Sequence, residues 1–310
     1  MPLLPVPHRH EEFDPADLAV RKQAAGLGVS VCLPARDEEA TVGHIVATVR
    51  RTLMEAVPLV DEVVVLDDGS TDATAEAAAW EGARVVAVDD LLLETGPGSG
   101  KGNAMWKSLD ACDGDLLCWV DADIRNFGSH FVSGLLGPLL TNPEIGFAKG
   151  FYRRPLHGEP HGGGRVTELV ARPLISALFP QLARFVQPLS GEYAGRREIL
   201  ESVPFVEGWG VEFGLLVDVV EQFGLGATAQ VDLGVREHRN RPLEDLGPQA
   251  TAIVVTALRR AGLEGERNLA ELQRFNDRFE PEAILVEVRE RPPMCTVPAY
   301  SRKHGRELTA

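Results

Sequence analysis

The sequence predicts an α/β protein built on a mostly parallel sheet that is flanked by helices. The first observation is that short apolar runs alternate with longer helical patterns through the first half of the chain, as in strands joined by right-handed crossovers. The second is that acidic pairs directly follow two of these runs, at the strand ends where open α/β sheets bind ligands. The third is an ordinary globular composition, with 44% hydrophobic and 25% charged residues in a chain of 310.

Each predicted strand of the first half is a short apolar run, and each predicted helix has apolar residues at helical spacing or is rich in alanine. Residues 1 to about 27 are predicted to be a loose arm with one short helix, Pro15–Ala25. The strands are predicted at Val29–Leu33, Glu62–Leu66, Arg84–Val88 and Leu116–Val120. The helices between them are predicted at Glu38–Met54, Thr71–Glu81 and Lys101–Ala111. This order is typical of a nucleotide-binding α/β layer.

The second half alternates less regularly. Its predicted helices are Ser129–Leu140, Arg165–Leu178, Val211–Phe223 and Asp245–Ala261, and its predicted strands are Ile145–Phe151 and Ala227–Leu233. After Leu263 the chain is highly charged, so we expect a tail that drapes over the surface or frays.

Charge and cysteine content narrow the class of function. A formal net charge of −15 disfavours nucleic acid and anionic membranes as partners, and an anionic substrate would need a local basic cluster. The four cysteines show no CxxC spacing, and Cys32 and Cys118 lie in apolar runs, which indicates buried reduced thiols in a cytoplasmic protein. We expect neither a signal peptide nor a membrane span.

The most informative motif is Asp121-Ala122-Asp123, which directly follows the apolar run Leu116–Val120. Side chains two residues apart on a strand point to the same side, so both carboxylates leave the strand end together. Buried side by side they would repel each other. Mg²⁺ or Mn²⁺ would remove that cost, because hard cations prefer oxygen ligands and bridge carboxylates to a substrate diphosphate. The alternative interpretation is a strand that ends in an Asp-rich turn.

Three further motifs lie at strand or helix edges. Pro34–Glu39 closes the first strand, where a loop can meet a base and a ribose, although its acidic residues also suit a helix start. Asp67–Asp72 closes the second strand, and helix capping does not explain its first two carboxylates. Gly96–Asn103 is glycine-rich and places Lys101 at a helix start, which can hold a diphosphate even though the Walker spacing is absent.

Together with Asp121–Asp123, these motifs resemble the GT-A class of nucleotide-sugar glycosyltransferases. Four longer motifs in the second half resemble the glucosyl-3-phosphoglycerate synthases, whose product is the phosphorylated precursor of glucosylglycerate and whose close relatives use mannose. These motifs are Phe151–Pro155, Gly162–Leu169, Gln187–Tyr193 and Arg236–Leu243. The resemblance covers the chain from about Val29 to Leu263.

The resemblance implies a GT-A nucleotide-sugar-binding sheet flanked by helices, with a mixed α/β C-terminal half that binds the acceptor. We therefore expect an arm over residues 1–28, a nucleotide-sugar-binding subdomain over 29–125, an acceptor-binding subdomain over 126–262 and a tail over 263–310. A homodimer is usual for the family, and its members take a nucleoside diphosphate hexose and 3-phosphoglycerate with Mg²⁺ or Mn²⁺.

The resemblance also implies roles on the donor side. The nucleotide sugar is expected to contact Pro34, Ala35, Arg36, Glu38, Asp68, Lys101, Asp121, Leu189 and Arg236. Arg36 stands where the family usually has leucine, which leaves the base preference open. Asp123 and His238 are the expected metal ligands. A lone histidine is often structural, but arginines at 236, 239 and 241 flank this one, and a packed core rarely takes so many cations together.

On the acceptor side, the expected contacts are Gly164, Arg165, Thr167, Ser190, Gly191 and Asn240. Arg165 follows three glycines, and backbone amides at a helix start together with a forked guanidinium suit a phosphate, although a flexible glycine turn is the alternative. Asp123, Glu212 and Lys101 are the expected catalytic residues. Glu212 fits equally well as a first-turn helix glutamate and is not predicted to be a nucleophile.

The predicted reaction moves a hexose, with glucose preferred, from a nucleoside diphosphate sugar to the 2-hydroxyl of 3-phosphoglycerate with retention at the anomeric carbon. One alternative is a mannosyl-3-phosphoglycerate synthase that uses GDP-mannose. A second is a sugar-1-phosphate nucleotidyltransferase, which would need a glycine-rich basic loop after the first strand, where this chain has Pro34–Glu39. A third is a non-catalytic nucleotide-sugar-binding module, which would have no need for both a metal site and an acceptor pocket.

Overall fold

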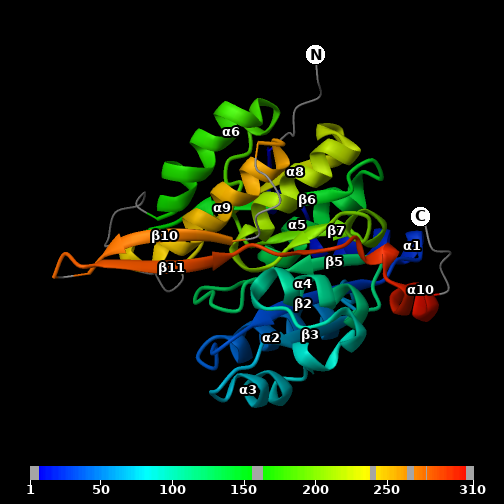
Figure 1. Ribbon diagram of the computed structural model, residues 1–310. Helices are drawn as coiled ribbons and strands as arrows, with labels where there is room; N and C mark the ends of the chain where they lie inside the picture. Colours follow the sequence, from blue (N-terminus) through cyan, green and yellow to red (C-terminus); the bar gives the residue numbers. More distant parts are fainter. Residues whose placement is uncertain (1–6, 156–162, 238–241, 264–268, 277, 305–310) are drawn as a thin grey trace.

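The predicted α/β class is confirmed by a computed structural model, which describes residues 7–155, 163–237, 242–263, 269–276 and 278–304 (Figure 1). Eight strands form its main sheet, in which β7 is antiparallel to both neighbours and all other pairs are parallel. In spatial order the strands are β1 (Pro7–Arg9), β9 (Thr228–Val235), β6 (Phe147–Arg153), β7 (Tyr193–Arg196), β5 (Leu116–Trp119), β2 (Val29–Ala35), β3 (Glu62–Asp67) and β4 (Arg84–Ala87).

Helices cover both faces of this sheet (Figure 1). One face packs against α1 (Pro15–Ala25), α2 (Val42–Val49), α3 (Thr74–Trp80) and α5 (His130–Thr141). The other packs against α4 (Gly100–Ala111), α6 (Arg172–Leu178), α8 (Val211–Phe223), α9 (Leu246–Arg260) and α10 (Pro298–His304). The short α7 (Arg197–Leu200) directly follows β7.

The pleat of the central strands explains why two separate cores form. Successive side chains of a strand point to opposite faces, so in β2 Val31 and Leu33 join the core beneath α2 and α5, whereas Cys32 joins the core beneath α4 and α8. Strands that are buried on both faces carry continuous apolar runs. This is why the short runs in the sequence identified the strands β2, β3 and β5.

Several predicted elements differ from the observed ones at their ends. The helix predicted over Glu38–Met54 begins at Val42 as α2 and continues as a π-helical turn, Arg50–Glu55. The helix predicted over Arg165–Leu178 is likewise divided into a π-helical turn, Thr167–Ala171, and α6. Main-chain hydrogen bonding at helix ends is set by local contacts that the apolar pattern does not encode.

The tail was predicted to drape over the surface or to fray, and its described residues form regular secondary structure rather than fraying. Strands β10 (Leu269–Phe275) and β11 (Pro281–Glu287) form an antiparallel hairpin, and β12 (Glu290–Arg291) pairs antiparallel with β8 (Phe205–Val206) (Figure 1). Alternate residues of the hairpin, among them Leu272, pack against α9, and the exposed positions between them include charged residues such as Glu271 and Glu287 as well as the apolar Leu285. The expectation of fraying rested only on the high charge of the whole segment after Leu263. It therefore overlooked the alternation of buried and exposed positions that is typical of a strand.

The N-terminal arm is also more ordered than expected. Its residues Pro7–Arg9 form β1, which pairs in parallel with β9 at the edge of the main sheet. The main sheet therefore includes strands from the arm and from both halves of the chain. No helix within the described ranges is both long enough and apolar enough to cross a lipid bilayer.

Candidate functional site

The strands β2, β3 and β5 end at a cavity of about 530 Å³ that brings both halves of the chain together. Pro34 and Ala35 come from the end of β2, Lys101 from the first turn of α4, Glu212 from the first turn of α8 and Arg236 from the segment after β9. The predicted site residues that line this cavity are Pro34, Ala35, Arg36, Glu38, Asp68, Lys101, Asp121, Asp123, Gly164, Arg165, Thr167, Leu189, Gly191, Glu212 and Arg236.

Lys101 lies between two carboxylates at the base of the cavity. Its ammonium hydrogen bonds to Asp121 and lies 2.8 Å from Oε1 of Glu212. Burial opposes its charge, but these two carboxylates raise the pKa of Lys101 well above the usual range. The lysine is therefore positively charged. It is held between Asp121, which follows β5, and Glu212, which lies in α8. Glu212 was the predicted residue whose role the sequence left most open.

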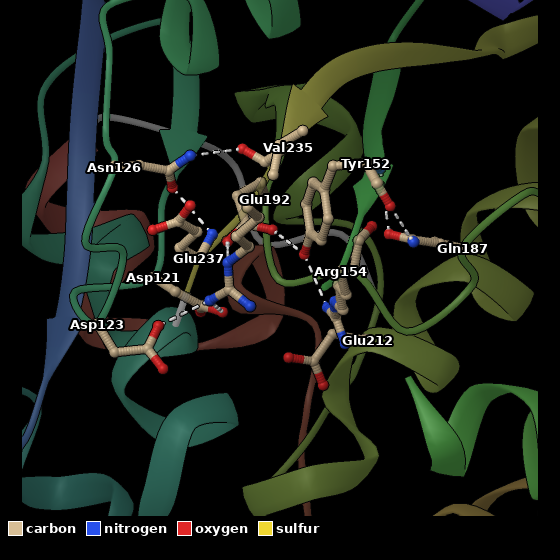
Figure 2. A network of polar contacts seen from close by, with 12 residues as sticks. Asp121, Asp123, Asn126, Tyr152, Arg154, Gln187, Glu192, Glu212, Val235 and Glu237 are labelled. Carbon is tan, nitrogen blue, oxygen red and sulfur yellow. Dashed lines mark hydrogen bonds and ion pairs between the residues drawn. The ribbon is translucent and has the colours of Figure 1, made fainter. Parts of the chain in front are cut away.

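Arg236 links three carboxylates, those of Asp121, Asp123 and Glu192, which are labelled in Figure 2. Its Nη2 lies 2.6 Å from Asp121 Oδ2 and 2.7 Å from Asp123 Oδ1, and its Nε lies 3.0 Å from Glu192 Oε1. Only 3% of the Arg236 side chain is exposed. A buried cation is stable only when it is paired, and here three acids share one guanidinium.

The pKa values of the two aspartates in the Asp121-x-Asp123 motif are shifted in opposite directions. Burial acts to raise the pKa of Asp121, but Lys101 and Arg236 outweigh it and hold this pKa far below its usual range. Burial raises the pKa of Asp123, and the charge of Asp121 adds to that effect while Arg236 only partly opposes it. Asp123 is thus the carboxylate whose charge the surrounding protein leaves under-compensated.

This arrangement fits a hard divalent cation at Asp123. A cation there would supply the positive charge that the Asp123 carboxylate lacks, and oxygen ligands suit Mg²⁺ and Mn²⁺. Within the described ranges no group of three or more His, Cys, Asp or Glu residues forms a ready metal cluster. His238, the second predicted ligand, lies outside the described residues, as does Asn240.

Four of the residues predicted to bind the acceptor, Gly164, Arg165, Thr167 and Gly191, line the same cavity. Gly164 adopts a positive φ of 78° just before Arg165 and Thr167, a conformation that glycine tolerates at no steric cost. Gly191 packs directly against the acidic centre: an added Cβ would lie 2.3 Å from Asp121 Oδ2 and 2.6 Å from Lys101 Nζ. Predicted donor and acceptor residues thus line one cavity.

Ser190 was predicted to bind the acceptor, but it does not line the cavity. Its side chain is fully buried, and the Ser190 carbonyl accepts a hydrogen bond from Lys149 Nζ at 2.8 Å. The peptide of Ser190 therefore anchors the segment that carries Leu189 and Gly191. Burial lowers the pKa of Lys149 to about 7, and no sequence signal distinguished this strand lysine from an ordinary sheet residue.

Sequence reasoning also assigned no role to Arg154, Tyr152 and Glu192, although all three lie in motifs that carried the resemblance. Arg154 lines the cavity and donates from Nη2 to the Tyr152 hydroxyl at 2.7 Å, and that hydroxyl hydrogen bonds to Glu192 (Figure 2). Burial raises the pKa of Glu192. Two signals were available in the sequence: the alternation of side chains along β6, and Glu192 directly before β7. Neither signal indicates that Tyr152 and Glu192 meet, because they lie 40 residues apart in sequence.

Arg36 and Asp68, two residues predicted to contact the nucleotide sugar, are more exposed than Arg236. Arg36 lies near Asp68, whose pKa is raised by burial and lowered in part by the charge of Arg36. An arginine at this position therefore places a positive charge close to the carboxylate at the end of β3.

The chain matches the family model described as glycosyl transferase family 2 over residues 30–200. Glucosyl-3-phosphoglycerate synthase from Petrotoga mobilis is 45% identical, with 96% of both chains covered. The enzyme of the same name from Mycolicibacterium smegmatis is 48% identical, with 91% of this chain and 93% of the relative covered.

Solved structures show the same likeness. Glucosyl-3-phosphoglycerate synthase from Mycobacterium tuberculosis, in complex with Mn²⁺, UDP-glucose and phosphoglyceric acid, matches with a TM-score of 0.82 at 45% identity, covering 91% of this chain and 94% of that one. Mannosyl-3-phosphoglycerate synthase from Rubrobacter xylanophilus matches with a TM-score of 0.85 at 41% identity, covering 93% and 94%.

Proposed function

The chain belongs to the glucosyl-3-phosphoglycerate synthase family, and from that premise we propose that its cavity transfers glucose from a nucleoside diphosphate glucose to the 2-hydroxyl of 3-phosphoglycerate. The enzyme is a metal-dependent hexosyltransferase with a GT-A fold. The observation that carries the proposal is that an acidic centre, Asp121 and Asp123, shares one cavity with an arginine-bearing turn, Gly164–Thr167.

In this proposal Asp123 and His238 hold the divalent cation. When bound, Mg²⁺ or Mn²⁺ would neutralise the diphosphate leaving group. Asp121 would contact the ribose, and the loop Pro34–Glu38 would meet the nucleoside. Arg236 fixes the orientation of both aspartates before substrate arrives, which limits the reorganisation that the reaction requires.

The acceptor would be oriented by its phosphate. Arg165 and Thr167 would bind that group, and the missing side chain of Gly191 lets the main chain lie directly against Asp121 and Lys101. Lys101 would place its ammonium next to the departing phosphates. Glu212 already accepts a hydrogen bond from Lys101, which supports a role in holding the lysine rather than in attacking the anomeric carbon.

A panel of four donors, UDP-glucose, GDP-glucose, UDP-mannose and GDP-mannose, tests the proposal with 3-phosphoglycerate as acceptor. We expect both glucose donors to be used, with relaxed base selectivity because Arg36 replaces the leucine usual in the family. Product mass and sugar analysis identify the reaction. A rate with GDP-mannose far above that with either glucose donor would contradict the choice of glucose and favour the mannosyl alternative. The similarity to the Rubrobacter enzyme is the reason for including the mannose donors.

A separate incubation with a sugar 1-phosphate and a nucleoside triphosphate, without 3-phosphoglycerate, addresses the nucleotidyltransferase alternative. That reaction would join the sugar phosphate to the α-phosphate of the nucleotide and release the β- and γ-phosphates as pyrophosphate, and it would not depend on the acceptor. We expect no pyrophosphate and a strict need for 3-phosphoglycerate. Acceptor-independent pyrophosphate release would refute the glycosyltransfer proposal.

Replacing Arg236 with lysine is expected to lower kcat/KM by about 10- to 100-fold. Lysine keeps the charge, but a single ammonium cannot reproduce the guanidinium fork that reaches Asp121, Asp123 and Glu192 together. Steady-state kinetics measure the change, and circular dichroism checks the fold. Arg153→Lys on the neighbouring strand is the matched control, because that side chain is exposed. Wild-type kinetics for Arg236→Lys would argue against this bridging role.

A cytoplasmic homodimer completes the proposal. Cys32, Cys112 and Cys118 are buried free thiols, which supports a reducing compartment. Light scattering in solution measures the oligomeric state, and a monomer at assay concentration would refute the dimer.

A further inference from the structure

Arg291 in strand β12 has its guanidinium buried against the segment that carries Lys101. Its Nε lies 2.7 Å from Glu207 Oε1 and donates to Asn103 Oδ1 at 3.0 Å. Its Nη1 and Nη2 donate to the carbonyls of Thr95 and Gly96 at 2.9 and 3.3 Å. Only 7% of the Arg291 side chain is exposed. One residue of the C-terminal tail therefore fixes both the loop before α4 and the first turn of that helix.

Aromatic and main-chain contacts support the same junction. The Arg291 guanidinium lies over the Trp106 ring, 5.2 Å from its centroid, and the Trp106 indole donates to the Pro292 carbonyl at 2.8 Å. Strand β12 pairs with β8, and the amide of Glu207 donates to the Arg289 carbonyl at 2.9 Å. The backbone thus presents Arg291 and its acidic partner to each other at a fixed spacing.

The glycines of the loop are explained by this packing. A Cβ at Gly98 would lie 1.9 Å from Arg291 Nη2, and a Cβ at Gly102 would lie 1.9 Å from the Val206 carbonyl. Gly100 adopts a φ of 76°, and a Cβ there would lie 3.1 Å from the Gly208 Cα. The glycine-rich pattern that resembled a phosphate loop therefore serves a close approach between the start of α4, strand β8 and Arg291.

We propose that Arg291 is a positioning residue for the transfer, which acts by holding the start of α4 so that Lys101 stays between Asp121 and Glu212. The glycines on either side of Lys101 pack against β8 and the turn after it, and that turn leads directly into the helix that carries Glu212. A shift of the loop would therefore move the lysine and its glutamate partner relative to Asp121, which follows a different strand. In the described part of the chain no hydrogen bond or ion pair joins Lys101 to Arg291, so the effect passes through the main chain. This inference rests on the proposed role of Lys101.

The test is Arg291→Lys assayed well below its unfolding temperature. Lysine keeps the charge but loses the forked donors and the flat contact with Trp106. We expect kcat to fall about 10- to 100-fold, since small misplacements of catalytic groups have effects of that size. The KM for 3-phosphoglycerate should stay within about twofold of wild type, because the Arg165 turn does not touch Arg291. A purely structural role would lower the unfolding temperature and leave kcat unchanged.

Two further variants keep the result interpretable. Arg289→Lys is the matched control, because this neighbouring arginine is half-exposed and its side chain pairs only with Glu287 in the described structure. Glu207→Gln keeps the shape of the junction while weakening its ion pair, so it reports on the same role if Arg291→Lys fails to fold; we expect kcat about 3- to 10-fold below wild type. A folded Arg291→Lys or Glu207→Gln variant with wild-type kcat overturns the inference.

Lys101→Met separates this inference from the proposed function. If Lys101→Met retains wild-type kcat, the proposed role of Lys101 fails, and with it the basis for a positioning effect. If Lys101→Met is inactive while folded Arg291→Lys is fully active, only the positioning inference fails. Loss of kcat in both variants, with an unchanged acceptor KM in Arg291→Lys, is the expected outcome.

Discussion

Replacing Asp123 with asparagine is expected to reduce kcat/KM by about 10³-fold. Burial raises the pKa of the Asp123 carboxyl and Arg236 only partly opposes this, so a cation bound there would stabilise its charged form and would depend on it. Loss of a metal interaction of several kcal/mol corresponds to a rate change of about this size. Steady-state assays over a range of Mn²⁺ concentrations measure it, and excess chelator should abolish wild-type transfer in the same way.

Asp90→Asn is the matched control for this change, because Asp90 is exposed and does not line the cavity. Circular dichroism and thermal unfolding check that Asp123→Asn is folded. Asparagine removes a negative charge beside Asp121, so we expect no large loss of stability. Full transfer activity in excess chelator would remove the metal from the proposal, whatever the behaviour of the variant.

Replacing Arg165 with lysine or alanine is expected to reduce transfer to 3-phosphoglycerate by about 30- to 1,000-fold in kcat/KM. An arginine can bind a phosphate through two parallel hydrogen bonds, a geometry that lysine cannot reproduce. Loss of a charge-assisted contact of this kind costs roughly 2–4 kcal/mol. Binding of the nucleotide sugar, measured by calorimetry, should stay near wild type, because Asp121 and the Pro34–Glu38 loop lie on other elements.

Arg172→Lys provides the matched control for Arg165. It lies at the start of α6 in the same segment, pairs with Glu168 at 2.8 Å and does not line the cavity. The kcat/KM of the wild-type enzyme should fall by a comparable factor when glycerate replaces 3-phosphoglycerate, because glycerate lacks the phosphate. If glycerate serves equally well, or if Arg165→Ala has no effect, the acceptor assignment is wrong and only the nucleotide-sugar half of the proposal remains.

The sequence by itself determined the elements whose side chains obey a local period. The strands β2, β3 and β5 were recognisable because a strand buried on both faces must be apolar throughout, and α8 was predicted with its observed bounds, Val211–Phe223. The acidic motifs were recognisable because each lies directly at a strand end. In a parallel sheet those ends meet at one edge, so local order along the chain already implied a shared site.

The tertiary structure alone decided which charges are paired. Arg236 meets Asp121 and Asp123 across more than 110 residues, and Arg291 meets Asn103 across 188 residues. No periodicity within the chain encodes such pairs, because they depend on the order of strands in the sheet and on how the tail returns to it. The glycines around Lys101 looked like a phosphate loop in sequence, and their contacts with Arg291, Gly208 and Val206 exist only once distant segments pack together.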